Sequence, residues 1–194
     1  MADQLTGKLS PFLRRRRLAA VRPYFGPGRN LDYGCGVGEL ATFLPPEGYL
    51  GVDIDAESVV IAGGRYPSHR FATIEELEDS DEGGFERVFA LALIEHLPNP
   101  AGWLKDLRRR VVVGAKLIVT TPEPRLQWAH DLGGRLGIFS RQGAEEHQSL
   151  MNRRRLVALS QGTGWALVRF RRFLCGANQL FELRALSSED REAG

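Results

Sequence analysis

The fold class of this chain is decided by the stretch Leu31-Asp32-Tyr33-Gly34-Cys35-Gly36-Val37-Gly38-Glu39-Leu40. Apolar residues over 30–33 predict a short buried strand, and a run compatible with a helix covers 39–44. Between them, three glycines on alternate positions permit positive φ angles and a close approach of the backbone to a ligand. Free N–H groups at a helix start also suit an anionic or hydroxyl-rich partner. The pattern predicts a nucleotide-type binding loop; a tight turn without a ligand is the alternative.

The spacing of the glycines separates two classes of cofactor. A dinucleotide fingerprint, G-x-G-x-x-G, would place a third glycine at position 39, where this chain has Glu39. The order D-x-G-x-G-x-G over 32–38 instead resembles motif I of the class I S-adenosylmethionine-dependent methyltransferases. In that family the loop backbone holds the amino-acid end of the cofactor. The resemblance therefore implies S-adenosylmethionine as cofactor and S-adenosylhomocysteine as product, and it counts against a dehydrogenase.

A second strand, predicted at 49–55, carries Asp53 nineteen residues after Gly34. Doubly wound sheets place a ribose-binding carboxylate at about this distance, because a carboxylate accepts hydrogen bonds from two vicinal hydroxyls. The feature supports a nucleoside ligand, and it supports methyl transfer only together with the glycine loop. A third strand is predicted at 69–73, and in the resembled family the residues just past it touch the adenine. The resemblance implies these cofactor-binding residues: Asp32, Gly34, Cys35, Gly36, Gly38, Asp53, Ile54, Thr73, Ile74 and Leu91.

Further motifs come in the order that the same family has. A continuous apolar strand at 85–93 runs into Glu95-His96-Leu97 and then into a helix begun by Pro100. The segment 111–122 resembles the family's glycine turn and fifth strand, with Gly114-Ala115 in place of the more usual Gly-Gly. The resemblance thus covers about residues 30–122 through several linked motifs. It implies an α/β fold, a Rossmann-like, doubly wound, seven-stranded and mostly parallel sheet with helices on both faces.

Two alternating segments, 165–173 and 178–186, predict the antiparallel C-terminal hairpin of that sheet. The chain has 194 residues, of which 43% are hydrophobic, and this suits one domain with a sizeable core. We therefore expect a single methyltransferase domain over 1–194. Its expected parts are a basic N-terminal helix or cap (1–29), a cofactor-binding core (30–122), a lid or substrate loop (123–150), a C-terminal helix and hairpin (151–186) and a flexible tail (187–194).

The sequence predicts a reduced, cytoplasmic location. The first ten residues lack the apolar core of a signal peptide, and no apolar run approaches the ~20 residues of a membrane span. The two cysteines, Cys35 and Cys175, are far apart, and one lies in the glycine loop. They predict neither a disulfide framework nor a multi-cysteine metal site.

Two histidines are candidate catalytic residues. Methyl transfer from a sulfonium needs a base only when the acceptor is a hydroxyl that must lose its proton, and histidine suits this task because its pKa lies near 7. His96 sits just past the fourth strand and His147 comes after the predicted lid. The alternatives are that His96 orients the loop and that His147 fastens the lid. Neither belongs to a metal-binding spacing such as H-x-x-x-H, so we expect no metal.

The residues after the fourth strand narrow the choice of acceptor. The Asn/Asp-Pro-Pro-aromatic block of amino-directed nucleic-acid methyltransferases is absent there. We therefore expect a small-molecule acceptor, with oxygen favoured as the methylated atom, and no nucleic acid.

Four consecutive arginines at 14–17 leave alternatives open, because helical residues ~100° apart cannot all share one solvated face.

The four arginines, Arg14, Arg15, Arg16 and Arg17, predict a solvated basic helix, a cap over the active site or a contact with an anionic surface. Two other functions also remain open. One is an RNA- or ribosome-associated methyltransferase that uses this helix, and the other is a cofactor-binding partner protein without activity.

Overall fold

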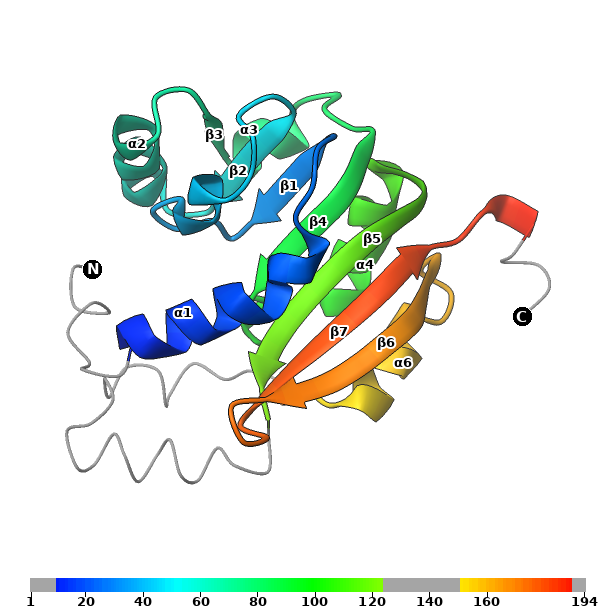
Figure 1. The fold of residues 1–194 in the computed structure, drawn as a ribbon. Coiled ribbons are helices and arrows are strands. Elements are labelled where there is room, and N and C mark those ends of the chain that lie inside the picture. The colour runs from blue at the N-terminus through cyan, green and yellow to red at the C-terminus, as the bar shows by residue number, and fades with distance from the viewer. Residues whose placement is uncertain (1–9, 124–150, 190–194) are drawn as a thin grey trace.

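Seven strands form one mixed sheet in the computed structural model, which describes residues 10–123 and 151–189 (Figure 1). The strand order is β3-β2-β1-β4-β5-β7-β6. The first five strands of the chain pair in parallel, and β7 runs antiparallel to both of its neighbours. The strands are β1 (Asn30–Tyr33), β2 (Tyr49–Asp53), β3 (Arg70–Thr73), β4 (Phe85–Leu91), β5 (Val111–Pro122), β6 (Trp165–Phe173) and β7 (Asn178–Ala185). The predicted sheet and its C-terminal hairpin are confirmed.

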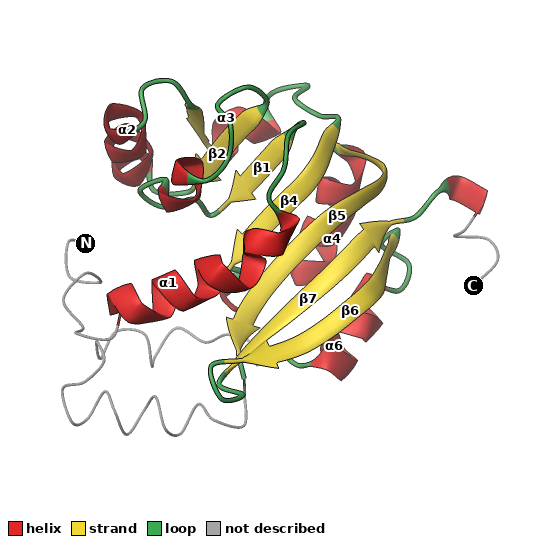
Figure 2. Ribbon diagram, viewed as in Figure 1, coloured by secondary structure: helices red, strands yellow, loops and turns green. Residues whose placement is uncertain are grey.

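Helices lie against both faces of this sheet (Figure 2). Buried leucines of α3, α4 and α6 belong to one apolar cluster, whereas residues of α1 belong to a second cluster on the opposite face. We call these the α4 face and the α1 face. The helices are α1 (Ser10–Val21), η2 (Arg22–Tyr24), η3 (Glu39–Thr42), α2 (Ala56–Arg65), α3 (Ile74–Glu78), η4 (Ile94–His96), α4 (Pro100–Arg109) and α6 (Arg153–Ser160).

Alternation along the strands decides which residues meet which helices. Leu31 and Tyr33 of β1 pack in the α4-face cluster, so the side chain of Asp32 between them points to the α1 face. Tyr33 meets Trp103 of α4 edge to face, with ring centroids 5.5 Å apart. On the other side, Tyr49, Phe89 and Ile118 form the α1-face cluster with α1 itself.

The helix expected at 39–44 is shorter than the sequence indicates. Only the 3-10 helix η3 forms, and it begins after Gly38, whose φ of 79° is left-handed. Pro45 and Pro46 come closely after it, and the residue before a proline disfavours the helical conformation. Within the loop, the N–H groups of Gly34, Cys35, Gly36 and Gly38 already donate to Val52, Cys35 and Asp53, so the loop offers few free N–H groups.

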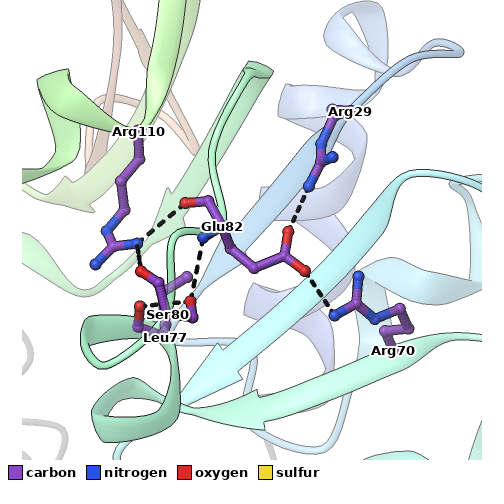
Figure 3. Close-up of polar contacts among 6 residues, drawn as sticks. All are labelled: Arg29, Arg70, Leu77, Ser80, Glu82 and Arg110. Carbon is purple, nitrogen blue, oxygen red and sulfur yellow. Dashed lines mark hydrogen bonds and ion pairs between the residues drawn. The ribbon is translucent and has the colours of Figure 1, made fainter.

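Charged side chains tie together the ends at which the parallel strands begin (Figure 3). Glu82, before β4, accepts from Arg29 at 2.5 Å and from Arg70 at 2.7 Å. Arg110, before β5, donates to the carbonyls of Ser80 and Glu82, both at 3.0 Å. We call these five residues the amino-edge cluster. They link the starts of β1, β3, β4 and β5. The cluster therefore fastens the end of the sheet that is opposite to the glycine loop.

Within residues 10–123 and 151–189, no helix is long and apolar enough to cross a membrane. The lid predicted at 123–150 lies, beyond Glu123, outside the described residues. His147 lies there too, and its role stays a prediction.

Candidate cofactor site at the carboxyl edge

The glycine loop joins β1 to η3 at the edge where the parallel strands end. Gly34, Gly36 and Gly38 have φ angles of 80°, 51° and 79°, which side chains rarely adopt. A Cβ on Gly38 would lie 2.9 Å from the ring of Phe71, and one on Gly34 would lie 3.1 Å from Leu93. A Cβ on Gly36 would meet nothing within 4 Å. Gly34 and Gly38 are thus packed, whereas Gly36 borders open space.

Asp53 holds this loop from the end of β2. The Gly36 N–H donates to its Oδ2 at 2.7 Å, and the Asp55 N–H donates to its Oδ1 at 3.0 Å. A carboxylate offers about four acceptor positions, so each oxygen keeps one for another donor. The side chain is half-buried beside the open space at Gly36. A group with two adjacent hydroxyls is the natural donor for such a carboxylate.

Residues after β2 and β3 flank Asp53. Ile54 exposes 84% of its surface directly after the carboxylate, which is unusual for a large aliphatic side chain. Thr73 pairs with Asp53 in the register of β2 and β3, and its hydroxyl accepts from the N–H of Glu76, capping α3. Ile74 packs instead against the α4-face cluster. Ile54 is therefore the better placed of the two isoleucines to cover a flat apolar ring.

Beneath the loop lies a buried acid. Asp32 is 4% exposed, and its Oδ2 accepts from the hydroxyl of Tyr49 at 2.9 Å. Burial raises the pKa of Asp32 to about 7, while the Tyr49 bond acts in the opposite direction. Burial also raises the pKa of the Cys35 thiol well above its ordinary range, so this cysteine is an unreactive thiol. Asp32 thus supports the loop from below, and Cys35 is a buried residue of the loop itself.

The end of β4 forms the next part of the edge. Leu91 is half-buried against the α1-face cluster, and Ala92 has a left-handed φ of 56°. Such strain in a residue other than glycine concentrates at functional sites. Leu93 then packs on Gly34, so the two strongest sequence motifs are in contact. His96 ends η4 with an exposed side chain at the same edge.

Helix α1 crosses to this edge and contributes two of its four arginines. Arg14 pairs with Glu39, directly after the glycine loop, at 2.9 Å. Arg17 interacts electrostatically with Glu95, which is 4% exposed and also bonds Thr121. Burial raises the pKa of Glu95 to about 7, although Arg17 and Thr121 oppose this shift. Among the described residues, Arg17 Nε and Glu95 Oε2 have no hydrogen-bond partner.

Comparison with known proteins decides the family. A family model described as a methyltransferase domain matches residues 5–169. The chain belongs to the S-adenosylmethionine-dependent methyltransferases. This methyltransferase is 35% identical over 101 residues to a ubiquinone biosynthesis O-methyltransferase of Alkalilimnicola ehrlichii, covering 48% of this chain and 41% of that protein. It is 27% identical over 168 residues to a trans-aconitate 2-methyltransferase of Methylobacterium nodulans, covering 84% and 63%.

The chain therefore matches less than two thirds of the length of these two curated relatives. Among solved structures, a SAM-dependent methyltransferase of Methanosarcina mazei superposes with a TM-score of 0.63 at 18% identity. That match covers 86% of this chain and 97% of the other. At this identity the likeness shows the fold. Together with the family match, it confirms the predicted family, fold class and cofactor, S-adenosylmethionine.

The geometry of the edge fits this cofactor. Its ribose has two vicinal hydroxyls for Asp53, and the open space at Gly36 leaves room beside the loop backbone. Ile54, directly after Asp53, presents an exposed aliphatic surface of the kind that suits a nucleobase. Among residues 10–123 and 151–189, no three His, Cys, Asp or Glu side chains gather closely enough to hold a metal ion.

The structure brings most of the predicted cofactor residues to one edge, and it adds others there. The loop glycines, Asp53, Ile54, Thr73, Leu91 and His96 do share this edge, and their individual roles stay predictions. Sequence reasoning missed Glu95, which it read only as part of a motif. The signal that could have found it was an acid in the short segment between the buried fourth strand and the next helix. Arg17 was foreseen in part, since at least one arginine of the run was expected to lie over the body of the protein.

Proposed function

We propose that this methyltransferase transfers the methyl group of S-adenosylmethionine to an oxygen atom of a small metabolite. The observation that carries the proposal is Asp53, fixed by two backbone N–H groups beside the open face of Gly36. The names of the relatives support the acceptor, because one is an O-methyltransferase of ubiquinone biosynthesis and the other is named for trans-aconitate. Both names denote small molecules.

The residues of this chain would bind and orient the reactants and exclude water. When bound, S-adenosylmethionine supplies a methyl group on a positively charged sulfur, which is already activated for displacement. The free acceptor positions of Asp53 would take the ribose hydroxyls, and Ile54 would cover the adenine. Alignment of the acceptor oxygen then supplies most of the acceleration. The exposed imidazole of His96 would remove the acceptor proton, with His147 as the second candidate for this role.

The cofactor part of the proposal is tested by calorimetric titration with S-adenosylhomocysteine and, separately, NAD. Asp53→Ala is expected to weaken the binding of S-adenosylhomocysteine by about 1.5–3 kcal/mol, because a charged acceptor for two hydroxyls is lost. Asp55→Ala is the matched control, since its carboxylate lies two residues away and accepts from the hydroxyl of Ser58. Equal losses in both variants, binding of NAD alone, or no binding of either ligand would overturn the assignment.

The acceptor part is tested by transfer of a labelled methyl group to a panel of phenols, carboxylates and amines. Label in phenols or carboxylates supports oxygen transfer, and label in amines alone contradicts it. Tight binding of S-adenosylhomocysteine without transfer to any member of the panel would instead favour a cofactor-binding partner protein. His96→Gln should lower kcat at neutral pH and leave the affinity for S-adenosylhomocysteine unchanged, because the imidazole acts on the acceptor.

A further inference from the structure

Three cations lie side by side across three neighbouring strands. Arg87 of β4 pairs in register with Lys116 of β5, and Lys116 pairs with Arg184 of β7. Neighbouring strands are about 4.8 Å apart, so the three side chains form a continuous row. Phe89 and Ile118, two residues further along β4 and β5, belong to the α1-face cluster, which places the row on the same face. Arg169 of β6 lies diagonally from Arg184.

We call Arg87, Lys116, Arg184 and Arg169 the cationic row. Lys116, Arg184 and Arg169 are exposed, whereas Arg87 is half-buried and donates to the carbonyl of Pro27. Two acids lie beside the row: Glu86 is 3.9 Å from Arg87, and Glu182, which is almost fully buried, is 3.8 Å from Arg169. Within the described residues, no carboxylate pairs with Lys116 or Arg184.

Arg87 and Arg169 have contacts within the fold, but the central pair of the row, Lys116 and Arg184, has no evident role in stability. Lys116 and Arg184 stand directly opposite one another on antiparallel strands, and like charges in this position destabilise a sheet. An anionic partner would remove the repulsion. The four arginines of the sequence run do not supply the same surface, because Arg14 pairs with Glu39 and Arg17 interacts with Glu95.

The neighbourhood of the row indicates which anion fits. The residues directly before Lys116 bulge from β5, where Phe85 and Arg87 pair with Val111 and Lys116, and Val113 exposes 62% of its surface. Val168, directly before Arg169, is also largely exposed. Exposed aliphatic side chains beside cations are typical of proteins that lie on anionic lipids. Nucleic acid would call for aromatic rings on which bases stack, and the large apolar side chains exposed on β5 and β6 are valines.

We propose that the cationic row and its exposed valines bind the surface of an anionic lipid bilayer. This inference does not depend on the acceptor of the methyl group. Each basic side chain near such a surface changes partitioning about fivefold, and the effect declines as salt screens the charges. The exposed pair at the centre of the row, Lys116 and Arg184, should therefore account for about 25-fold.

The test is co-sedimentation of the full chain with vesicles of 30% phosphatidylglycerol in phosphatidylcholine, beside vesicles of phosphatidylcholine alone. The variant is Lys116→Gln with Arg184→Gln. Its matched control is Lys105→Gln with Arg109→Gln, which removes the same charge from exposed positions of α4, on the opposite face. We expect binding to the anionic vesicles alone, a loss of about 25-fold in the variant, and no comparable loss in the control.

The variant should melt no lower than the unmodified chain, because it removes a like-charge pair from the sheet. A lower melting temperature would reveal a structural role and overturn the argument. So would equal binding to both kinds of vesicle, equal losses in variant and control, or no binding at 50 mM salt. Binding of duplex or single-stranded RNA without binding of vesicles would assign the row to nucleic acid instead.

Discussion

The two edges of the sheet handle charge in opposite ways. At the amino edge, Glu82 bonds two arginines and its pKa is lowered, chiefly through Arg70, while Arg110 bonds carbonyls (Figure 3). At the carboxyl edge, burial raises the pKa of Asp32 and of Glu95 to about 7. One oxygen of Glu95 there has no hydrogen-bond partner among the described residues. Paired charges stabilise a fold, whereas buried acids with few partners cost stability and mark a site.

The two edges also differ in the backbone strain of residues other than glycine. Among the described residues, the three residues other than glycine with left-handed φ angles, Ala92, Leu174 and Cys175, follow strand ends at the carboxyl edge, whereas glycines with positive φ occur at both edges. The amino-edge cluster instead consists of ion pairs and hydrogen bonds between parts of the chain, as expected of contacts that stabilise a fold. If this comparison is correct, substitutions at the carboxyl edge should change ligand affinity to an extent that does not follow the change in the free energy of unfolding. Substitutions at the amino edge should change the free energy of unfolding alone.

The largest effect is expected from a pair of glycine substitutions within the loop. Gly38→Ala should destabilise the chain by about 2–6 kcal/mol, because its Cβ would overlap the Phe71 ring in addition to the strain of φ. Gly36→Ala should cost only about 1–2 kcal/mol, since its Cβ meets open space. Gly36→Ala should nevertheless weaken S-adenosylhomocysteine strongly by filling that space.

Urea unfolding and calorimetry on the same two variants check this contrast. Similar losses of stability would show that the loop is packed throughout and that Gly36 borders no ligand. Unchanged affinity in Gly36→Ala would place the ligand elsewhere along the edge.

Local spacing was sufficient to predict most of this edge. The glycine pattern, the position of Asp53 and the order of the later motifs each depend on a few neighbouring residues, so the sequence predicted the sheet and the loop. The extent of η3 was wrong, because the two prolines after Leu44 outweighed the apolar pattern. The partners of Asp32 and Glu95 come from Tyr49, Arg17 and Thr121, far along the chain, and no periodicity reports such contacts.

The cationic row shows the same limit. Arg87, Lys116 and Arg184 lie on three separate strands, and only the register of those strands makes them neighbours. The arginine run at 14–17 was conspicuous in the sequence, yet the structure divides it between the glycine loop, the β4 edge and solvent. Clusters in sequence and clusters in space are thus different sets of residues.

A second, intermediate effect is expected from Asp32→Asn. The folded pKa of Asp32 lies near 7, above its ordinary 3.8, so between these values the folded state holds a proton that the unfolded state lacks. Stability contributed by this group is therefore complete below about pH 4 and is lost as the pH rises through about 7. Asparagine removes the charge and can still accept from Tyr49, so the variant should gain about 1–3 kcal/mol at pH 8.

Urea unfolding from pH 4 to pH 8 measures this difference, with Asp106→Asn as the control at an exposed, ion-paired position of α4. The gain should vanish near pH 4. A difference in stability that is constant at every pH, or the same dependence on pH in the control, would show that the buried carboxyl of Asp32 is not the cause. A gain in stability together with weaker binding of S-adenosylhomocysteine would sharpen the comparison. It would show that the carboxylate of Asp32 favours ligand binding at a cost in stability.

The smallest effect is expected at the amino edge. Arg70 and Arg29 hold the pKa of Glu82 below its ordinary value, so its contribution is present above about pH 4.5 and is lost as the pH falls through the folded pKa. The arginines are largely exposed, which limits the loss in Glu82→Gln to about 0.5–1 kcal/mol at pH 7. Its affinity for S-adenosylhomocysteine should be unchanged, because the cluster joins strand starts and the cofactor site lies at strand ends. The sign of the pH slope is opposite to that of Asp32, so unfolding curves at pH 4 and pH 7 distinguish the edges even where the magnitudes are close. A weakened cofactor affinity in Glu82→Gln would mean that the amino edge also positions the glycine loop, and the division of labour between the edges would then fail.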